Sequence, residues 1–330
     1  MTLASQRREW YLACMQSHTT GRNSDPSPMP EAHRGPWRAA RALAVAALAL
    51  ATTVLVAAAW LARSPRPQRH FTEVQIPTPE GVVVAQLSPP RRRDAPWVVL
   101  VHGSRRQGQD HRLYREIRTR VSAEAGVLAI DLLGFGRSAL AAGAELHHPL
   151  DRSTEVLAAL DWLSREHAVG DDRMVLVGHS FGAAQVLLAA HSRPVKLVAA
   201  IAPYDWDAAG AEANAPMTIA AKIERRLGVR VDPADVAAEL RALAAVSLFA
   251  PCAEVPIVLL GGSCEPADGL FRRRERVPPS CRAGVRWVTI PLADHMYGTE
   301  GGSLPRPLRR LASRLMIDRL AWHLNRLLPD

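Results

Sequence analysis

The sequence has few aromatic residues, few cysteines and little net charge outside its N-terminal arm. Phe, Trp and Tyr make up 5% of the 330 residues, and there are four Cys. Neither a CxxC pair nor a Cys/His spacing typical of structural zinc occurs, so we expect no metal site. Nine Arg and three acidic residues precede residue 71, which places about +6 of the net charge of +9 in this arm. The remainder has no basic stripe interleaved with aromatics, so we expect no nucleic-acid partner.

One uninterrupted apolar run lies near the N-terminus. Residues 42–62 contain no charged side chain, and about 20 helical residues span a bilayer core of roughly 30 Å. The sequence therefore predicts a transmembrane or signal helix at 39–62, between a leader at 1–38 and a linker at 63–70. Three Arg lie close to each end of the run, so the positive-inside rule gives little orientation.

Two outcomes remain open for this segment. An uncleaved helix would anchor the protein to a membrane, whereas the small residues Ala57, Ala58 and Ala59 suit cleavage of a signal peptide. In the first case the membrane is a partner, and in the second the protein is secreted or periplasmic. Either outcome predicts that the rest of the chain is exported.

Export would allow disulfides to form among the cysteines that follow the apolar run. Cys14 falls in the leader, and Cys252, Cys264 and Cys281 fall in the exported part. Cys264 and Cys281 bracket one loop between two predicted strands, so we favour that pair and expect one cysteine to remain unpaired.

Beyond residue 70, short apolar runs alternate with helical patterns. Such alternation is typical of a mostly parallel sheet flanked by helices. The predicted strands are 71–76, 81–87, 97–101, 126–130, 174–177, 197–202, 257–260 and 285–290, and the predicted helices are 110–124, 151–167, 181–191 and 304–328. Residues 204–250 read as helices without a strand, which predicts a helical cap inserted into the sheet domain.

A G-x-S-x-G motif lies at residues 178–182, with Ser180 at its centre. A buried strand precedes it and a helix follows it, as a nucleophile elbow requires. The turn would present the Ser180 hydroxyl above the sheet, beside a helix N-terminus that stabilises negative charge. This arrangement predicts a catalytic serine.

A serine hydroxyl is a weak nucleophile at neutral pH and needs a base. His295 follows the last predicted strand and precedes the final helix, which makes it the candidate base. An acid must hold the imidazole in the correct tautomer. Glu265 and Asp268 both follow the strand at 257–260, so either one gives the chain order nucleophile, acid, base.

From about residue 71 to its end, the chain resembles the α/β-hydrolase family. The G-x-S-x-G elbow matches in full. The D-x-x-G-x-G-x-S stretch after the fourth strand matches as well, and so does the terminal D-H pair. In the G-x-x-D-P acid segment, Glu265 stands where the family has Asp. The matching residues are His102, Gly103, Asp131, Gly134, Gly136, Ser138, Gly178, Ser180, Gly182, Gly262, Pro266, Asp294 and His295.

This resemblance implies an oxyanion hole formed by the backbone N–H groups of Ser104 and Phe181. Such donors stabilise the tetrahedral intermediate of acyl transfer. We expect His102 to shape its loop by hydrogen bonding, Asp131 to stabilise a turn, and His179 to pack beside the elbow. No cofactor is expected.

Together these features predict an α/β-hydrolase domain at 71–330, with a helical cap at 204–250. The predicted function is hydrolysis of a small-molecule carboxylic ester or other acyl substrate through a Ser180 acyl-enzyme. A serine peptidase or lipase of the same fold is one alternative. Another is a non-catalytic hydrolase-fold protein that binds a partner at the membrane. The presence of Ser180, His295 and an acid in order argues against the last, because binding alone requires none of them.

Overall fold

A computed structural model describes Val45 and residues 70–326, except 142–145, 147, 205, 207–213, 266–270, 272–273, 275–276, 292, 298 and 300–304. Apart from Val45 and His70, the predicted leader, apolar helix and linker lie outside the described residues. Among the residues described, no helix is both long enough and apolar enough to cross a membrane. Residues Gln68–Asp330 belong to one compact unit.

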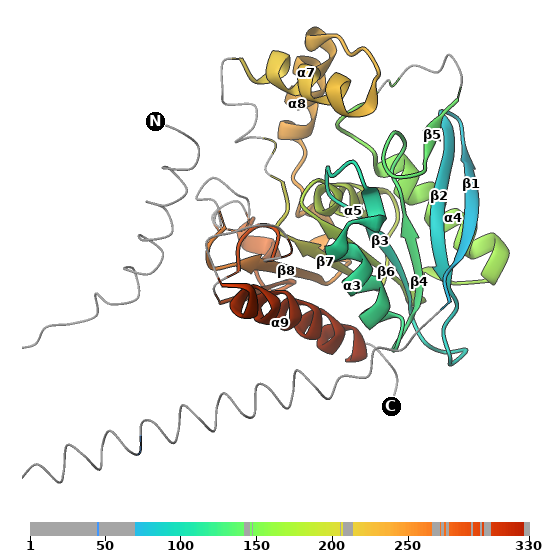
Figure 1. The fold of residues 1–330 in the computed structure, drawn as a ribbon, viewed down its shortest axis with the longest axis vertical. Coiled ribbons are helices and arrows are strands. Elements are labelled where there is room, and N and C mark those ends of the chain that lie inside the picture. The colour runs from blue at the N-terminus through green and yellow to red at the C-terminus, as the bar shows by residue number, and fades with distance from the viewer. Residues whose placement is uncertain are drawn as a thin grey trace, which may run out of the picture. The chain divides into compact units, whose positions relative to one another are not determined.

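The described elements follow the predicted alternation of strands and helices (Figure 1). The strands are β1 (Thr72–Thr78), β2 (Gly81–Ser88), β3 (Trp97–Val101), β4 (Gly126–Ile130), β5 (Ala139–Leu140), β6 (Met174–His179), β7 (Leu197–Ile201), β8 (Ile257–Gly262) and β9 (Val285–Ile290). The α-helices are α3 (Arg112–Val121), α4 (Ser153–His167), α5 (Phe181–Ser192), α7 (Ala215–Leu227), α8 (Pro233–Ala245) and α9 (Arg306–Asn325). Single 3-10 turns are η1 (Gly108–Asp110), η2 (Asp171–Arg173), η3 (Ala250–Ala253) and η6 (Pro279–Cys281).

The strands form one mixed sheet in the order β1-β2-β4-β3-β6-β7-β8-β9, with β5 paired to β2. The pairs of β2 with β1, β4 and β5 are antiparallel, and the six strands from β4 to β9 along this order are parallel. The central strands β3, β4, β6 and β7 are buried at every residue. Strands covered on both faces read as continuous apolar runs, which is why the sequence revealed them.

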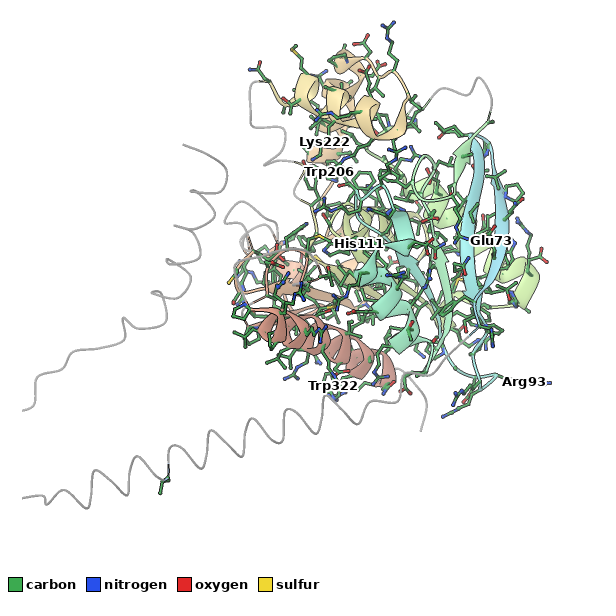
Figure 2. All side chains as sticks on the ribbon, in the orientation of Figure 1. Glu73, Arg93, His111, Trp206, Lys222 and Trp322 are labelled. Atoms are coloured by element: carbon green, nitrogen blue, oxygen red, sulfur yellow. A yellow bond between two sulfur atoms is a disulfide. The ribbon has the colours of Figure 1, made fainter. Side chains whose placement is uncertain are left out.

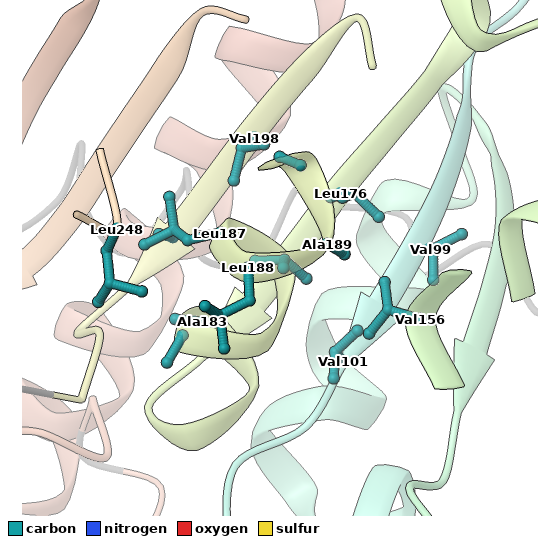
Figure 3. Packing of buried hydrophobic residues seen from close by; sticks show 14 of the residues in the cluster. Val99, Val101, Val156, Leu176, Ala183, Leu187, Leu188, Ala189, Val198 and Leu248 are labelled. Atoms are coloured by element: carbon teal, nitrogen blue, oxygen red, sulfur yellow. The ribbon is translucent and has the colours of Figure 1, made fainter. Parts of the chain in front are cut away.

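Two apolar layers cover the two faces of the sheet. Side chains of α3 and α9 form one layer with alternate residues of the central strands. Side chains of α4 and α5 form the other, part of which is drawn in Figure 3, with Leu187 of α5 near Val198 of β7. Buried residues of α7 and α8 extend this second layer, so the helices between β7 and β8 pack on the domain.

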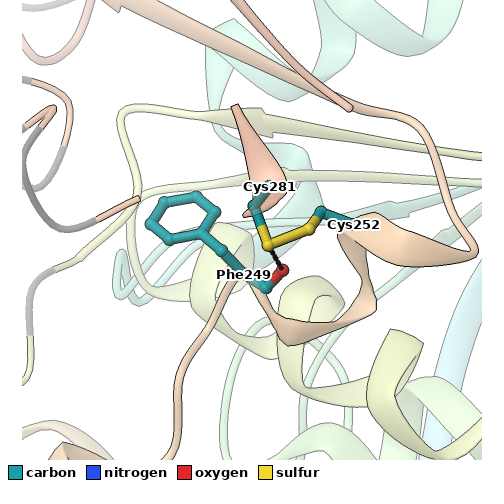
Figure 4. The surroundings of a disulfide bond; sticks show 3 residues. All are labelled: Phe249, Cys252 and Cys281. Carbon is teal, nitrogen blue, oxygen red and sulfur yellow. Dashed lines mark hydrogen bonds between the residues drawn. A yellow bond between two sulfur atoms is a disulfide. The ribbon is translucent and has the colours of Figure 1, made fainter. Parts of the chain in front are cut away.

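The disulfide joins Cys252 to Cys281, so the predicted Cys264–Cys281 pair is wrong. The reason is the parallel pairing of β8 with β9, in which Ile257 lies opposite Val285. Cys252 and Cys281 both precede these strands and meet at the same edge of the sheet, beside Phe249 (Figure 4). Cys264 follows β8 and lies at the opposite edge.

Candidate active site

Ser180 lies in a sharp turn between the last residue of β6 and the first residue of α5. Its backbone has φ 55° and ψ −118°, a conformation that costs energy for any residue other than glycine. A Cβ on Gly178 would lie 2.3 Å from the carbonyl oxygen of Gly182, and a Cβ on Gly182 would lie 2.3 Å from that of His102. Both glycines are therefore required for the close crossing of strand, turn and helix.

The loop after β3 packs against this turn. A Cβ on Gly103 would lie 3.1 Å from the Cβ of Ser180, so the backbone of this loop runs directly beside the serine. Within the described residues, the backbone N–H groups of Ser104 and Phe181 have no hydrogen-bond acceptor. Phe181 is also the first residue of α5, whose N-terminal amides favour negative charge.

Three side chains meet above the carboxyl ends of β6, β8 and β9. The Oγ of Ser180 lies 2.8 Å from Nε2 of His295, and Nδ1 of His295 lies 2.9 Å from a carboxylate oxygen of Glu265. Since a carboxylate only accepts, Nδ1–H donates to Glu265, and Nε2 then accepts the hydroxyl proton of Ser180. Glu265 is buried, whereas Ser180 and His295 are partly exposed.

The surroundings of His295 tune its basicity. Burial lowers the pKa of His295, but the hydrogen bond and charge of Glu265 and the charge of Asp294 outweigh it, so the pKa lies above its ordinary value. Glu265 therefore fixes the orientation of the ring and stabilises its protonated form. Asp268, the alternative acid, lies outside the described residues.

A second hydrogen-bonded chain, which the sequence analysis did not find, runs behind the first. Gly103 N–H donates to the hydroxyl of Tyr114 at 2.7 Å, and that hydroxyl lies 2.8 Å from Nδ1 of His179. Nε2 of His179 lies 2.8 Å from the carbonyl oxygen of His295. A carbonyl only accepts, so Nε2 carries the proton and Nδ1 accepts from Tyr114. Burial, followed by the charge of His295, lowers the pKa of His179 to about 3, which keeps this ring neutral.

The same chain links the loop beside Ser180 to the loop that carries His295. The prediction that His179 packs beside the elbow is confirmed, since it is buried there and hydrogen-bonded at both ring nitrogens. Tyr114, on α3, had no motif around it and no periodic signal other than that of a core helix.

The predicted structural roles of His102 and Asp131 are confirmed. Leu132 N–H donates to Nε2 of His102, and the opposite ring nitrogen therefore donates to the carbonyl oxygen of Gly103. The carboxylate of Asp131 accepts from the backbone N–H groups of Gln109 and Arg137. Both side chains are buried and hold the loops below the site.

Helix α7 contacts the loop after β3, which contains Ser104. The guanidinium of Arg226 donates to the carbonyl oxygen of Ser104 at 2.6 Å. The next residue, Leu227, faces Gly134, where an added Cβ would lie 3.0 Å from its side chain. Ahead of α7, the ring of Trp206 packs edge-on against that of Phe181 at 5.8 Å. The region between β7 and β8 is thus in contact with residues next to Ser180.

The described residues contain no group of His, Cys, Asp and Glu side chains suited to holding a metal ion. The arrangement of Ser180, His295 and Glu265 is that of a nucleophile, a base and an acid that orients the base, a combination suited to acyl transfer.

Comparison with known families agrees with this arrangement. The model of a family described as the alpha/beta hydrolase family matches residues 98–329. The chain belongs to the alpha/beta hydrolase family. The match begins within β3 and extends past the end of α9, so it includes the insertion with α7 and α8 as well as the three site residues.

Solved structures share the alpha/beta hydrolase fold at low sequence identity. An esterase from Pyrococcus furiosus has a TM-score of 0.55 and 15% identity, over 79% of this chain and 92% of the esterase. An alpha/beta hydrolase-fold protein of unknown function from Agrobacterium tumefaciens has a TM-score of 0.52 and 19% identity, over 78% of this chain and 100% of its own. A 2-hydroxy-6-oxo-6-phenylhexa-2,4-dienoate hydrolase from Rhodococcus has a TM-score of 0.50 and 16% identity, over 78% of this chain and 100% of the hydrolase. No curated protein matches the chain in sequence.

Proposed function

We propose that this hydrolase cleaves carboxylic esters through an acyl-enzyme on Ser180. The observation that supports this most directly is the line of hydrogen bonds from Ser180 Oγ to His295 Nε2 and from His295 Nδ1 to Glu265, at 2.8 and 2.9 Å. In this proposal His295 is the general base and Glu265 is the acid of the triad.

The reaction follows from the proton positions in this line. As the Ser180 oxygen attacks the ester carbonyl carbon, its proton passes to Nε2 of His295, and Glu265 stabilises the imidazolium that forms. The N–H groups of Ser104 and Phe181 bind the oxyanion of the tetrahedral intermediate. His295 then protonates the leaving alcohol and activates a water, which releases the acid and restores Ser180.

Esters are the proposed substrate class for two reasons. The G-x-S-x-G elbow with a serine nucleophile suits acyl transfer, and the similar structure from Pyrococcus furiosus is an esterase. A serine peptidase or lipase would use the same groups. A purely binding role would leave the strained backbone of Ser180 unexplained.

We also propose that the hydrolase domain is exported, with residues 39–62 as a membrane anchor or a cleaved signal. The Cys252–Cys281 disulfide supports this, because structural disulfides persist in oxidising compartments. The helices of the insertion are proposed to cap the site, on the basis of the contact between Arg226 and Ser104.

A fluorophosphonate probe tests the proposal, because it reacts covalently with an activated serine. We expect the full-length protein to be labelled, and Ser180→Ala to remain unlabelled at equal helical content by circular dichroism. Ser192→Ala, at the exposed end of the same helix α5, is the matched control and should be labelled like the wild type. A folded wild-type protein that resists the probe would refute the catalytic role.

A further inference from the structure

The side chain of Arg226 joins helix α7 to the loop after β3. Its guanidinium donates to the carbonyl oxygen of Ser104 at 2.6 Å, from a partly buried position in the last turn of the helix. The next residue, Leu227, packs against the core and lies near Gly134, so this turn of α7 is fixed to the domain. In Figure 2 the labelled Lys222 marks α7, about one turn before Arg226.

Ser104 is the central residue of a γ-turn. The backbone N–H of Arg105 donates to the carbonyl oxygen of Gly103 at 2.8 Å, and Nδ1–H of His102 donates to the same oxygen. In a planar trans peptide the C=O and N–H bonds point in opposite directions. The Gly103–Ser104 peptide therefore directs its oxygen into the turn and the Ser104 N–H out of it. This N–H is the proposed oxyanion donor, and it has no acceptor within the described residues.

The hydrogen bonds at this turn form one chain in which every donor points the same way. Arg226 donates to the Ser104 oxygen, and the Arg105 N–H of that same peptide donates to the Gly103 oxygen. The Ser104 N–H of the preceding peptide is then the last donor of the chain. Hydrogen bonds in such a chain polarise one another, so a positive charge at its start strengthens the donor at its end.

The helix dipole by itself favours any cation in the last turn of α7. Arg225 meets that condition as well, yet it is exposed and its side chain has no hydrogen bond or ion pair within the described residues. The direction of Arg226 toward the Ser104 carbonyl therefore needs a further reason. We propose that Arg226 is a positioning residue for ester hydrolysis, which aligns the Ser104 N–H with the oxyanion and strengthens it as a donor. This inference rests on the proposed function.

Arg226→Met tests the proposal, because it removes the guanidinium and keeps an unbranched side chain. The fluorophosphonate probe suits the test, since its phosphoryl oxygen occupies the oxyanion hole. The measured quantities are the labelling rate constant at saturating probe and the probe concentration that gives half this rate. Loss of an oxyanion donor costs about 100-fold or more, so misalignment of a donor that is still present should lower the rate constant about tenfold. The half-saturating concentration should stay unchanged.

Two matched variants accompany this one. Arg226→Lys keeps a charged donor and should recover most of the labelling rate. Arg225→Met removes the same charge from the neighbouring position on α7 and should label like the wild type. Each variant must keep the wild-type helical content by circular dichroism, and Arg226→Gln takes the place of Arg226→Met if the latter does not fold.

A pair of ketones separates this role from a loosened insertion. With 1,1,1-trifluoro-2-hexanone, the Ser180 oxygen bonds to the carbonyl carbon, its proton passes to His295, and the carbonyl oxygen becomes an oxyanion. The ketone 2-hexanone binds without this addition. Arg226→Met should weaken protection of Ser180 from the probe by the trifluoroketone about tenfold and leave protection by 2-hexanone unchanged.

The outcomes distinguish this inference from the proposed function. If folded Arg226→Met is labelled with the wild-type rate constant, or if protection by both ketones weakens equally, Arg226 does not align the Ser104 donor and the inference is refuted. The proposed function stands in either case. A folded wild-type protein that is never labelled would refute both.

Discussion

Among the described residues, the hydroxyl of Tyr114 links the loop beside Ser180 to His179 by hydrogen bonds, so its removal tests the second hydrogen-bonded chain. Tyr114 is fully buried and joins Gly103 N–H to His179 Nδ1 at 2.7 and 2.8 Å. Tyr114→Phe leaves a buried donor, Gly103 N–H, and a buried acceptor, Nδ1 of His179, without this partner. Each such group costs about 1–3 kcal/mol, so we expect the free energy of unfolding to fall by about 2–6 kcal/mol.

Tyr297→Phe is the matched control, because Tyr297 is equally buried. Its hydroxyl donates to the carbonyl oxygen of Leu260 at 3.2 Å, and that oxygen also accepts from the backbone N–H of Ala202 at 2.7 Å. Removing this hydroxyl leaves the carbonyl satisfied. We therefore expect a loss of about 1 kcal/mol or less.

Urea unfolding followed by tryptophan fluorescence measures both free energies, and the rate of fluorophosphonate labelling measures the site. Tyr114→Phe should slow labelling of the folded protein about tenfold, because the Gly103–Ser104 backbone loses the bond that orients it. Tyr297→Phe should label at the wild-type rate. If the two variants lose equal stability and label equally, the hydroxyl of Tyr114 does not hold this loop, and the reasoning from the chain is wrong.

Three further predictions concern the triad, the elbow and the disulfide. Glu265→Gln removes the charge that raises the pKa of His295, so the rise of labelling rate with pH should move to lower pH. The maximal labelling rate should fall about 100-fold or more, because the imidazolium of His295 loses its charged partner. Gly182→Ala places a Cβ 2.3 Å from a backbone carbonyl oxygen and should cost about 1–3 kcal/mol in urea unfolding. Reducing Cys252–Cys281, which closes a loop of 29 residues, should cost about 3–4 kcal/mol, seen as a lower urea midpoint in dithiothreitol.

Each of these has a distinct contrary outcome. A pH profile of Glu265→Gln identical to the wild type would transfer the role of the acid to Asp268. A Gly182→Ala protein as stable as the wild type would show that α5 can move away from the backbone of His102 without loss of stability. Equal urea midpoints with and without dithiothreitol would show that the cross-link does not restrain the unfolded chain, and Cys264→Ser should not alter the difference in either direction.

The parallel sheet and the site residues were largely predictable because their signals are local. Buried strands such as 97–101 and 126–130 are continuous apolar runs, and their predicted bounds agree with the structure. Ser180 and His295 were found because each follows a strand, and the carboxyl ends of parallel strands meet at one edge. The short strand β5 was missed, since two residues carry no periodicity.

Features that depend on spatial pairing were not predictable. The choice of Cys252 over Cys264 depends on which end of β8 lies beside the start of β9, and sequence spacing does not contain that information. The role of Tyr114 depends on a hydroxyl that meets Gly103 and His179 across three elements. The contact of Arg226 on α7 with the carbonyl oxygen of Ser104 likewise joins segments far apart in the sequence, and no local pattern indicates it.

The position of β9 at the rim of the sheet has a consequence for local unfolding near the candidate site. Among the described strands it pairs with β8 alone, so the strand that precedes the proposed base is attached through a single ladder, and we expect fraying to begin there. The Cys252–Cys281 bond fastens the amino end of this ladder, while Glu265 and His295 lie beyond its carboxyl end. A chain without the Cys252–Cys281 bond would keep Ser180, His295 and Glu265 yet spend more time with its rim strand detached. Oxidation would thus raise the fraction of molecules that hold acid, base and serine in line.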